Sequence, residues 1–226
     1  MYLAAEKDNQ NILKLLLSQL KEIKKDCFTN CTKLSKIIIP SSITKIGANA
    51  FHCCESLNQI TIPSSVTFID NSAFSNCSSL KKVIFQNPSS APSIEERVFY
   101  KCISLKDISI PSSVTTIKSN AFSDCSFKEI TIPSSVTFIG NSAFAYCSSL
   151  KKVIFQNPTS VPSIEERAFY GCKSLMGISI PSSVTIIKSY AFVNSSLNEI
   201  TIPSSVTFIG GSAFYDCSSL KKVIFQ

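Results

Sequence analysis

The chain has 226 residues, of which 44% are apolar and 16% are charged, and its formal net charge is +7. One histidine, no tryptophan and only two arginines leave little material for the common catalytic constellations. No apolar run approaches the roughly 20 residues that cross a bilayer. Because lysines supply almost all of the positive charge, bidentate recognition of phosphates or bases is disfavoured. The composition therefore argues against a membrane-spanning protein and predicts that the chain is not an enzyme.

The first element, residues 1–21, is expected to be helical and to differ from the rest of the chain. Leu3-Ala4-Ala5 and Ile12-Leu13-x-Leu15-Leu16-Leu17 resemble the helical core of an ankyrin repeat. The resemblance is partial, because Asp8 occupies the usual glycine position and no Thr-Pro-Leu motif precedes it. Two compatible interpretations remain open: a helical cap on the apolar end of the following segment, or an ankyrin remnant.

Residues 22–226 consist of one repeat of 22–25 residues that occurs about nine times. Its phenylalanines are Phe28, Phe51, Phe74, Phe99, Phe122, Phe144, Phe169, Phe192 and Phe214. An isoleucine lies five residues before each of them, and a cysteine lies three residues after eight of the nine. Groups of three units repeat every 70 residues, as ITIPSSVTFI does at 60–69, 130–139 and 200–209. Units of this size bury their apolar side chains only against neighbours, so the repeat predicts a solenoid.

Each unit contains a strand followed by a turn. Leu80, Val83 and Phe85 form an L-x-x-V-x-F pattern, whose last two apolar residues alternate as in a half-buried strand. A Pro-Ser-Ser segment ends the equivalent strands in other units. Stacking predicts a parallel β-sheet on the concave face of a right-handed coil. The convex face is expected to hold short helices or turns. The SIEE segments at 93–96 and 163–166 look like capping boxes that open a helical turn.

The consensus A-F-x-x-C-x-S-L-K-x-I-x-I-P-S-S-V-T-x-I covers residues 22–226 and resembles the BspA-type leucine-rich repeat of bacterial and protist surface antigens. The resemblance implies an α/β solenoid with a protein-binding surface, often used for adhesion to host cells or matrix. Residues 1–21 are then expected to form a helical N-terminal cap, and residues 22–226 the solenoid itself.

The other end of the solenoid has no predicted cap. Residues 221–226 (KKVIFQ) stop inside a strand and leave a flat apolar edge of the kind that proteins usually protect. We expect a fragment or an engineered boundary here, or self-association of copies end to end through this strand.

The cysteines are expected to form a buried column of reduced thiols, because stacked identical positions point in parallel and suit disulfide geometry poorly. One place resembles a metal site, since Cys27, Cys31, His52 and Cys53 could offer zinc sulfur and nitrogen ligands. Structural roles are favoured for all four, because Cys31 belongs to the column and Cys27 replaces a buried alanine. We therefore predict no metal, no cofactor and no catalytic residue.

The residues between the inward-facing positions of each strand form the expected partner-binding face. The candidate contact residues are Lys82, Ile84, Asp107, Glu129, Thr131, Lys152, Ile154 and Glu199. Ile84 with Lys82, and Ile154 with Lys152, form outward-facing apolar–cationic pairs that recur every third unit. Alternatively, these isoleucines only favour a strand and were copied by duplication. Without aromatic anchors on this face, weak multivalent contacts are expected rather than a tight hot spot.

These features predict a non-catalytic protein–protein interaction module. Surface adhesion or binding of a host or matrix protein is the first hypothesis, and an intracellular scaffold for cytosolic partners is the alternative. The family resemblance favours the cell surface, whereas the lack of a recognisable signal peptide and the expected free thiols favour the cytoplasm. Binding of nucleic acid or of another anionic polymer through the lysines is disfavoured, because Asp107, Glu129 and Glu199 alternate with lysines such as Lys82 and Lys152 at equivalent strand positions.

Overall fold

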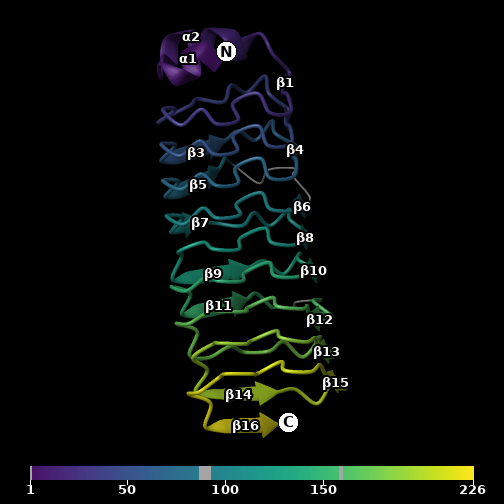
Figure 1. Ribbon diagram of the computed structural model, residues 1–226. Helices are drawn as coiled ribbons and strands as arrows, with labels where there is room; N and C mark the ends of the chain where they lie inside the picture. The colour runs from purple at the N-terminus through teal and green to yellow at the C-terminus, as the bar shows by residue number, and fades with distance from the viewer. Residues whose placement is uncertain (1, 87–92, 158–159) are drawn as a thin grey trace.

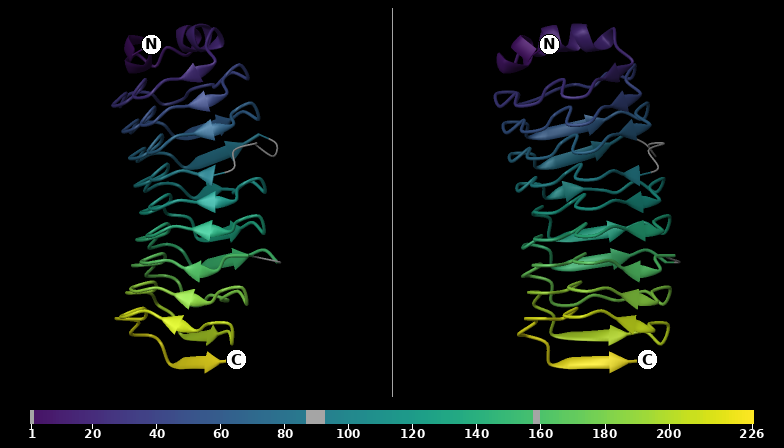
Figure 2. Two further views of the ribbon diagram at one scale, coloured as in Figure 1. Left: turned by 90° about the vertical axis from the view of Figure 1, so that its right-hand side faces the viewer. Right: turned by 45° about the vertical axis from the view of Figure 1, so that its right-hand side comes forward.

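A computed structural model describes residues 2–86, 93–157 and 160–226. The chain forms one column of stacked coils that starts with two helices and ends in a strand (Figure 1). Two further views show a nearly straight column in which each coil lies on the coil before it (Figure 2). Strands occur on two faces of the column, so the coils are joined by two separate parallel ladders.

The long-strand face carries the predicted strands. They are β3 (Gln59–Ile62), β5 (Lys82–Phe85), β7 (Asp107–Ile108), β9 (Glu129–Ile132), β11 (Lys152–Phe155), β14 (Glu199–Ile202) and β16 (Lys222–Phe225). All pairings between them are parallel, and equivalent residues of successive coils are partners, as Thr61 and Ile84 are. The predicted parallel sheet is therefore confirmed, whereas the predicted hand of the coil stays a prediction.

The second face, here the short-strand face, differs from the prediction. Its strands are β1 (Glu22–Ile23), β2 (Lys45–Ile46), β4 (Phe68–Ile69), β6 (Ser93–Ile94), β8 (Thr116–Ile117), β10 (Phe138–Ile139), β12 (Ser163–Ile164), β13 (Ile186–Ile187) and β15 (Phe208–Ile209). Each strand ends in an isoleucine that is buried in every strand except β15, where Ile209 is 40% exposed. This isoleucine pairs with the isoleucine of the next coil wherever the ladder continues. Short helices or turns were expected here; the short strands lead into turns, and the described part of residues 22–226 contains no helix.

The two predicted capping boxes are also wrong. Ser93 and Ser163 lie in strands β6 and β12, and their hydroxyls donate to the carboxylates of Glu95 and Glu165 instead of capping a helix. The backbone of Ile94 pairs with Ile117 of the next coil. Pairing between coils thus replaces the local hydrogen bonds that a helical turn requires.

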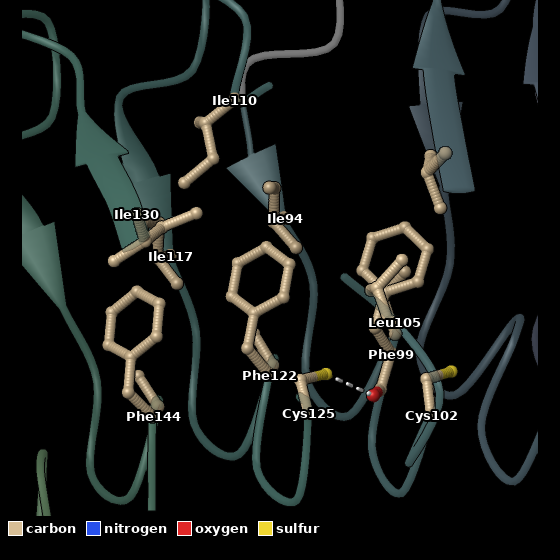
Figure 3. Packing of buried hydrophobic residues seen from close by; sticks show 14 of the residues in the cluster. Ile94, Phe99, Cys102, Leu105, Ile110, Ile117, Phe122, Cys125, Ile130 and Phe144 are labelled. Atoms are coloured by element: carbon tan, nitrogen blue, oxygen red, sulfur yellow. Dashed lines mark hydrogen bonds between the residues drawn. The ribbon is translucent and has the colours of Figure 1, made fainter. Parts of the chain in front are cut away.

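The core is a stack of phenylalanine rings that runs through all nine coils. Successive rings are nearly parallel, with centroids 5.1 to 5.7 Å apart. Figure 3 shows Phe99, Phe122 and Phe144 in this stack, flanked by the ladder isoleucines Ile94 and Ile117. Eight of the nine phenylalanines are completely buried, as the spacing predicts.

Each coil turns sharply around its phenylalanine by means of left-handed backbone. The residues two before and two after Phe122, Asn120 and Asp124, have φ values of 56° and 61°. Asparagine and aspartate tolerate this conformation better than most residues, and Gly171 takes it in a later coil with φ of 69°.

The N-terminal segment forms two helices, α1 (Tyr2–Glu6) and α2 (Gln10–Ser18). Helix α2 begins after Asn9, whose side-chain oxygen accepts a hydrogen bond from the Ile12 backbone N–H at 3.2 Å. Leu13 and Leu17 are buried in the same apolar cluster as the coils. In the part of the chain that the structure describes, no helix is long and apolar enough to span a membrane.

Candidate functional site

All eight candidate contact residues lie on the long-strand face, but they do not form one site. Lys82, Ile84, Asp107, Glu129 and Thr131 line one hollow of about 730 Å³ between β5, β7 and β9. The other three, Lys152, Ile154 and Glu199, line two smaller hollows of about 490 and 520 Å³ further along the column. The large hollow falls within the usual range of ligand pockets, roughly 300–1,000 Å³.

The large hollow lies where the long-strand ladder is interrupted. Strand β7 pairs with β5 but not with β9, so the sheet ends on one side of the hollow and begins again on the other. The small side chain of Ser109 lies in the hollow between the coils of Ile84 and Thr131. At the equivalent place one 70-residue block later, Ser179 pairs with Thr201, so the two coils are joined.

The charges of the hollow are only partly balanced. The Lys82 ammonium lies 2.6 Å from the Asp107 carboxylate, and this exposed pair contributes little to stability. Glu129 has no ion pair within the described residues. Ile84, Phe85 and Ile110 add apolar surface to the lining. An open hollow with apolar walls and a free carboxylate is suited to contact with a partner.

The cysteine column lies in the core. Seven of its thiols donate to the backbone carbonyl of the phenylalanine in the preceding coil, with sulfur–oxygen distances of 3.1 to 3.3 Å. Figure 3 shows the bond from Cys125 to the Phe99 carbonyl. All ten cysteines are free thiols. In the coil without a cysteine, the Ser195 hydroxyl lies 3.3 Å from the Cys217 sulfur.

Burial disfavours the thiolate form of several column cysteines, such as Cys31 and Cys147. It raises the pKa of Cys147 to about 12, with the carboxylate of Asp124 adding to the shift. For Cys31, burial and then the nearby Glu6 carboxylate raise the pKa to about 11. Because the thiolate is the reactive form, these cysteines are poor nucleophiles near neutral pH.

The same raised pKa values predict a loss of stability in alkaline solution. The unfolded thiols ionise near pH 8.5, whereas the buried thiols stay protonated, so the free energy of unfolding falls as the pH rises from about 8.5 towards 12. Below about pH 8.5 the buried thiols contribute a constant amount to the free energy of unfolding. Urea midpoints measured at pH 8 and pH 10 check the prediction.

The matched variant is Cys147→Ser, which copies the serine that the chain itself places at this position of another coil. It should lose less stability than the parent protein between the two pH values. An equal loss in both proteins would contradict a contribution from Cys147.

The structure does not assemble the possible zinc site. Among the described residues, which include Cys27, Cys31, His52 and Cys53, no group of three or more histidine, cysteine, aspartate or glutamate side chains could hold a metal ion.

One surface feature that the sequence analysis missed is a row of four exposed lysines, here the lysine ladder: Lys81, Lys106, Lys128 and Lys151. They follow the buried leucine position in four consecutive coils. The Lys106 N–H donates to the Lys81 carbonyl at 3.1 Å, and the Lys151 N–H donates to the Lys128 carbonyl at 2.7 Å. The signal was present in the sequence, because lysine recurs there in four units running.

A second missed feature is a set of phenylalanines on the short-strand face. Phe68, Phe138 and Phe208 precede the ladder isoleucine at intervals of 70 residues. Phe138 and Phe208 are 42% and 57% exposed, and the Lys45 ammonium lies 5.3 Å from the centre of the Phe68 ring. Exposed aromatic side chains are therefore present on the short-strand face, whereas the hollows of the long-strand face are lined by the half-buried Phe85 and Phe155.

A family model for the BspA type leucine rich repeat region matches six copies in this chain, over residues 7–125, 86–160 and 154–226. The chain belongs to this family. BspA-type and other leucine-rich-repeat proteins are generally protein-interaction modules, and their fold is typically not enzymatic. No curated protein matches the sequence.

Solved structures agree with this assignment. The BspA-type chain is similar to a leucine-rich repeat protein from Bacteroides ovatus, with 34% identity and a TM-score of 0.67 over 81% of this chain and 59% of that one. It therefore spans less than two thirds of the Bacteroides protein. The pneumococcal vaccine antigen PcpA shares the fold at 24% identity and a TM-score of 0.59, covering 92% of this chain and 60% of PcpA. A leucine-rich repeat protein from Eubacterium ventriosum does so at 20% identity and a TM-score of 0.52, with coverage of 88% and 81%.

Proposed function

We propose that this BspA-type chain is a non-catalytic module that binds a protein partner across its long-strand face. The observation that carries the proposal is the hollow between β5, β7 and β9, where five candidate residues converge. Its apolar walls offer contact area, and the unpaired Glu129 offers a charge for orientation. Lys152, Ile154 and Glu199 provide a second, shallower contact area one block later.

Surface adhesion to a host or matrix protein is the function we place first. The family assignment supports it, and so does the likeness to PcpA, which is named as a vaccine antigen. An intracellular scaffold is the alternative, supported by the free thiols. Antibody staining of source cells with and without permeabilisation separates the two: signal on intact cells supports adhesion, and signal only after permeabilisation contradicts it.

The binding face is tested with two matched substitutions. Ile84→Asp places a charge in the hollow, and Ile186→Asp places the same charge on the short-strand face at a similarly half-buried isoleucine. Against matrix proteins immobilised on a sensor surface, Ile84→Asp should weaken binding by tenfold or more, about 1.4 kcal/mol, while Ile186→Asp should not. Equal losses, or a larger loss with Ile186→Asp, would place the contact elsewhere.

We also propose that residues 1–21 cap the solenoid of residues 22–226. Leu13 and Leu17 are buried against the coils, and the Asp8 carboxylate accepts hydrogen bonds from the backbone and hydroxyl of Ser35 at 3.2 and 2.5 Å. Leu17→Asp should speed hydrogen exchange in the first coils and leave the last coils unchanged. If backbone amides of the first coils exchange no faster in Leu17→Asp than in the parent protein, the result would contradict a capping role.

End-to-end self-association remains a further proposal for the opposite end. It is supported by Val223 and Phe225 of β16, which are 43% and 71% exposed. Sedimentation at rising protein concentration should show a dimer that Phe225→Lys abolishes.

A further inference from the structure

We propose that the lysine ladder, Lys81, Lys106, Lys128 and Lys151, binds a linear sulfated polysaccharide. The ladder adjoins the hollow on the long-strand face but consists of other residues. The inference therefore does not depend on the proposed protein partner. It adds a second class of ligand to the same molecule.

The ladder concentrates positive charge that the protein does not neutralise. All four lysines are exposed, and none has an ion pair within the described residues. Hydrogen-bonded neighbours in a sheet lie about 4.8 Å apart, and like charges directly opposite one another are destabilising. Lys81 and Lys106 are joined in this way, as are Lys128 and Lys151. A bound polyanion would relieve the repulsion along the row.

Asp107 and Glu129, which directly follow the ladder residues Lys106 and Lys128, do not cancel the positive charge of the ladder. Asp107 is engaged by Lys82 at 2.6 Å, which leaves Glu129 as the free carboxylate beside the ladder. Lys152 adds a further unpaired cation within the described residues. In the sequence, lysine occupies the ladder position in four consecutive coils, whereas the next position alternates between Lys82, Asp107, Glu129 and Lys152. In the structure the ladder consists of two hydrogen-bonded pairs on either side of the break between β7 and β9.

The residue types favour a sulfated polysaccharide over a nucleic acid. Lysine is a point charge with rotatable donors, so it suits sulfate groups on a flexible chain, whereas bidentate phosphate recognition favours arginine. Single-stranded nucleic acid also needs aromatic stacking platforms, and the exposed Phe138 and Phe208 lie on the other face.

A row of serines accompanies the ladder. Two residues before each ladder lysine lies a half-buried serine: Ser79, Ser104, Ser126 and Ser149. The Ser126 hydroxyl already donates to the Ile103 carbonyl at 2.5 Å. Neutral hydroxyls next to a row of ammonium groups match a polymer that carries both hydroxyl and sulfate groups.

The test is binding of the full chain to heparin at increasing salt. The ladder variant changes all four lysines to glutamine. The control variant changes four other exposed, unpaired lysines to glutamine and has the same net charge: Lys14, Lys25, Lys33 and Lys173. The ladder variant should bind at least tenfold more weakly and lower the slope of log K against log salt by about three. The control should keep most of the affinity and the slope.

Several outcomes would overturn the proposal. The first is that the parent protein does not bind heparin at about 50 mM salt. The second is that the control variant loses as much affinity for heparin as the ladder variant does. Tighter binding of duplex DNA or of polyglutamate than of heparin would assign the ladder to another partner, and unchanged binding of desulfated heparin would exclude sulfate recognition. The ladder variant should melt no lower than the parent protein, because like charges have been removed. Ile84→Ser, which changes the hollow without adding a charge, should bind heparin normally, and this result separates the ladder from the hollow.

Discussion

Phe122→Ala lowers the free energy of unfolding by about 3–5 kcal/mol. The Phe122 ring is completely buried and lies 5.5 Å from the rings of both Phe99 and Phe144. It also meets the edge of Phe127 at 6.0 Å. Removal of the ring therefore interrupts the stack in the middle of the column and leaves a cavity between two coils. Urea unfolding followed by circular dichroism measures the loss.

The control is Phe138→Ala, because Phe138 is 42% exposed on the short-strand face. This change should cost less than about 1 kcal/mol, since it opens no cavity. Similar losses in both variants would mean that the ring stack contributes no more than an exposed phenylalanine. Hydrogen exchange adds a second readout, because coils on either side of Phe122 should open first in the Phe122→Ala protein.

Gly140→Ala should destabilise the protein by about 1–3 kcal/mol or more, although it adds a single methyl group. A β-carbon at Gly140 would lie 2.6 Å from the Ser119 backbone nitrogen and 2.9 Å from the Lys118 carbonyl carbon of the preceding coil. Because both contacts are with backbone, the two coils would have to move apart.

Gly177→Ala provides the matched comparison, since a β-carbon there meets no atom within 4 Å. It should be neutral or slightly stabilising, because alanine restricts the unfolded chain. Thermal melting of the two variants side by side measures the difference. Equal melting temperatures would show that the coils at Gly140 adjust without cost.

The repeat pattern was sufficient to predict the core but not the second ladder. Phe122, Ile117 and Cys125 recur with fixed spacing, and each is buried as predicted. The strands of the short-strand face have only two residues, as Lys45–Ile46 does. So short a strand leaves no alternation in the sequence, and its spacing to the phenylalanine is equally compatible with a helical turn. Backbone hydrogen bonds between neighbouring coils decide that these residues form a strand and not a helical turn.

The hollow could not be predicted, because it depends on where two coils separate. Ser109 and Ser179 stand in nearly identical segments, yet only Ser179 pairs with the following coil. The candidate residues share the long-strand face, since period-two alternation determines which side chains point outward. The lysine ladder was readable from the sequence, but the mixed charges of the adjacent column, such as Asp107, obscured it.

Side-chain hydrogen bonds give the column a direction. Seven cysteine thiols donate to the coil before their own, as Cys125 does, and so do hydroxyls of the turns that follow the long strands, such as those of Ser135 and Thr137. A ribosome releases the N-terminal coils first, so these donors find their acceptors already in place. The backbone also bonds in the other sense, because the N–H groups of Asn120, Phe122 and Asp124 donate to carbonyls of the following coil. Each new coil therefore bonds its side-chain donors to the coil before it and supplies the acceptors that those N–H groups lack until then.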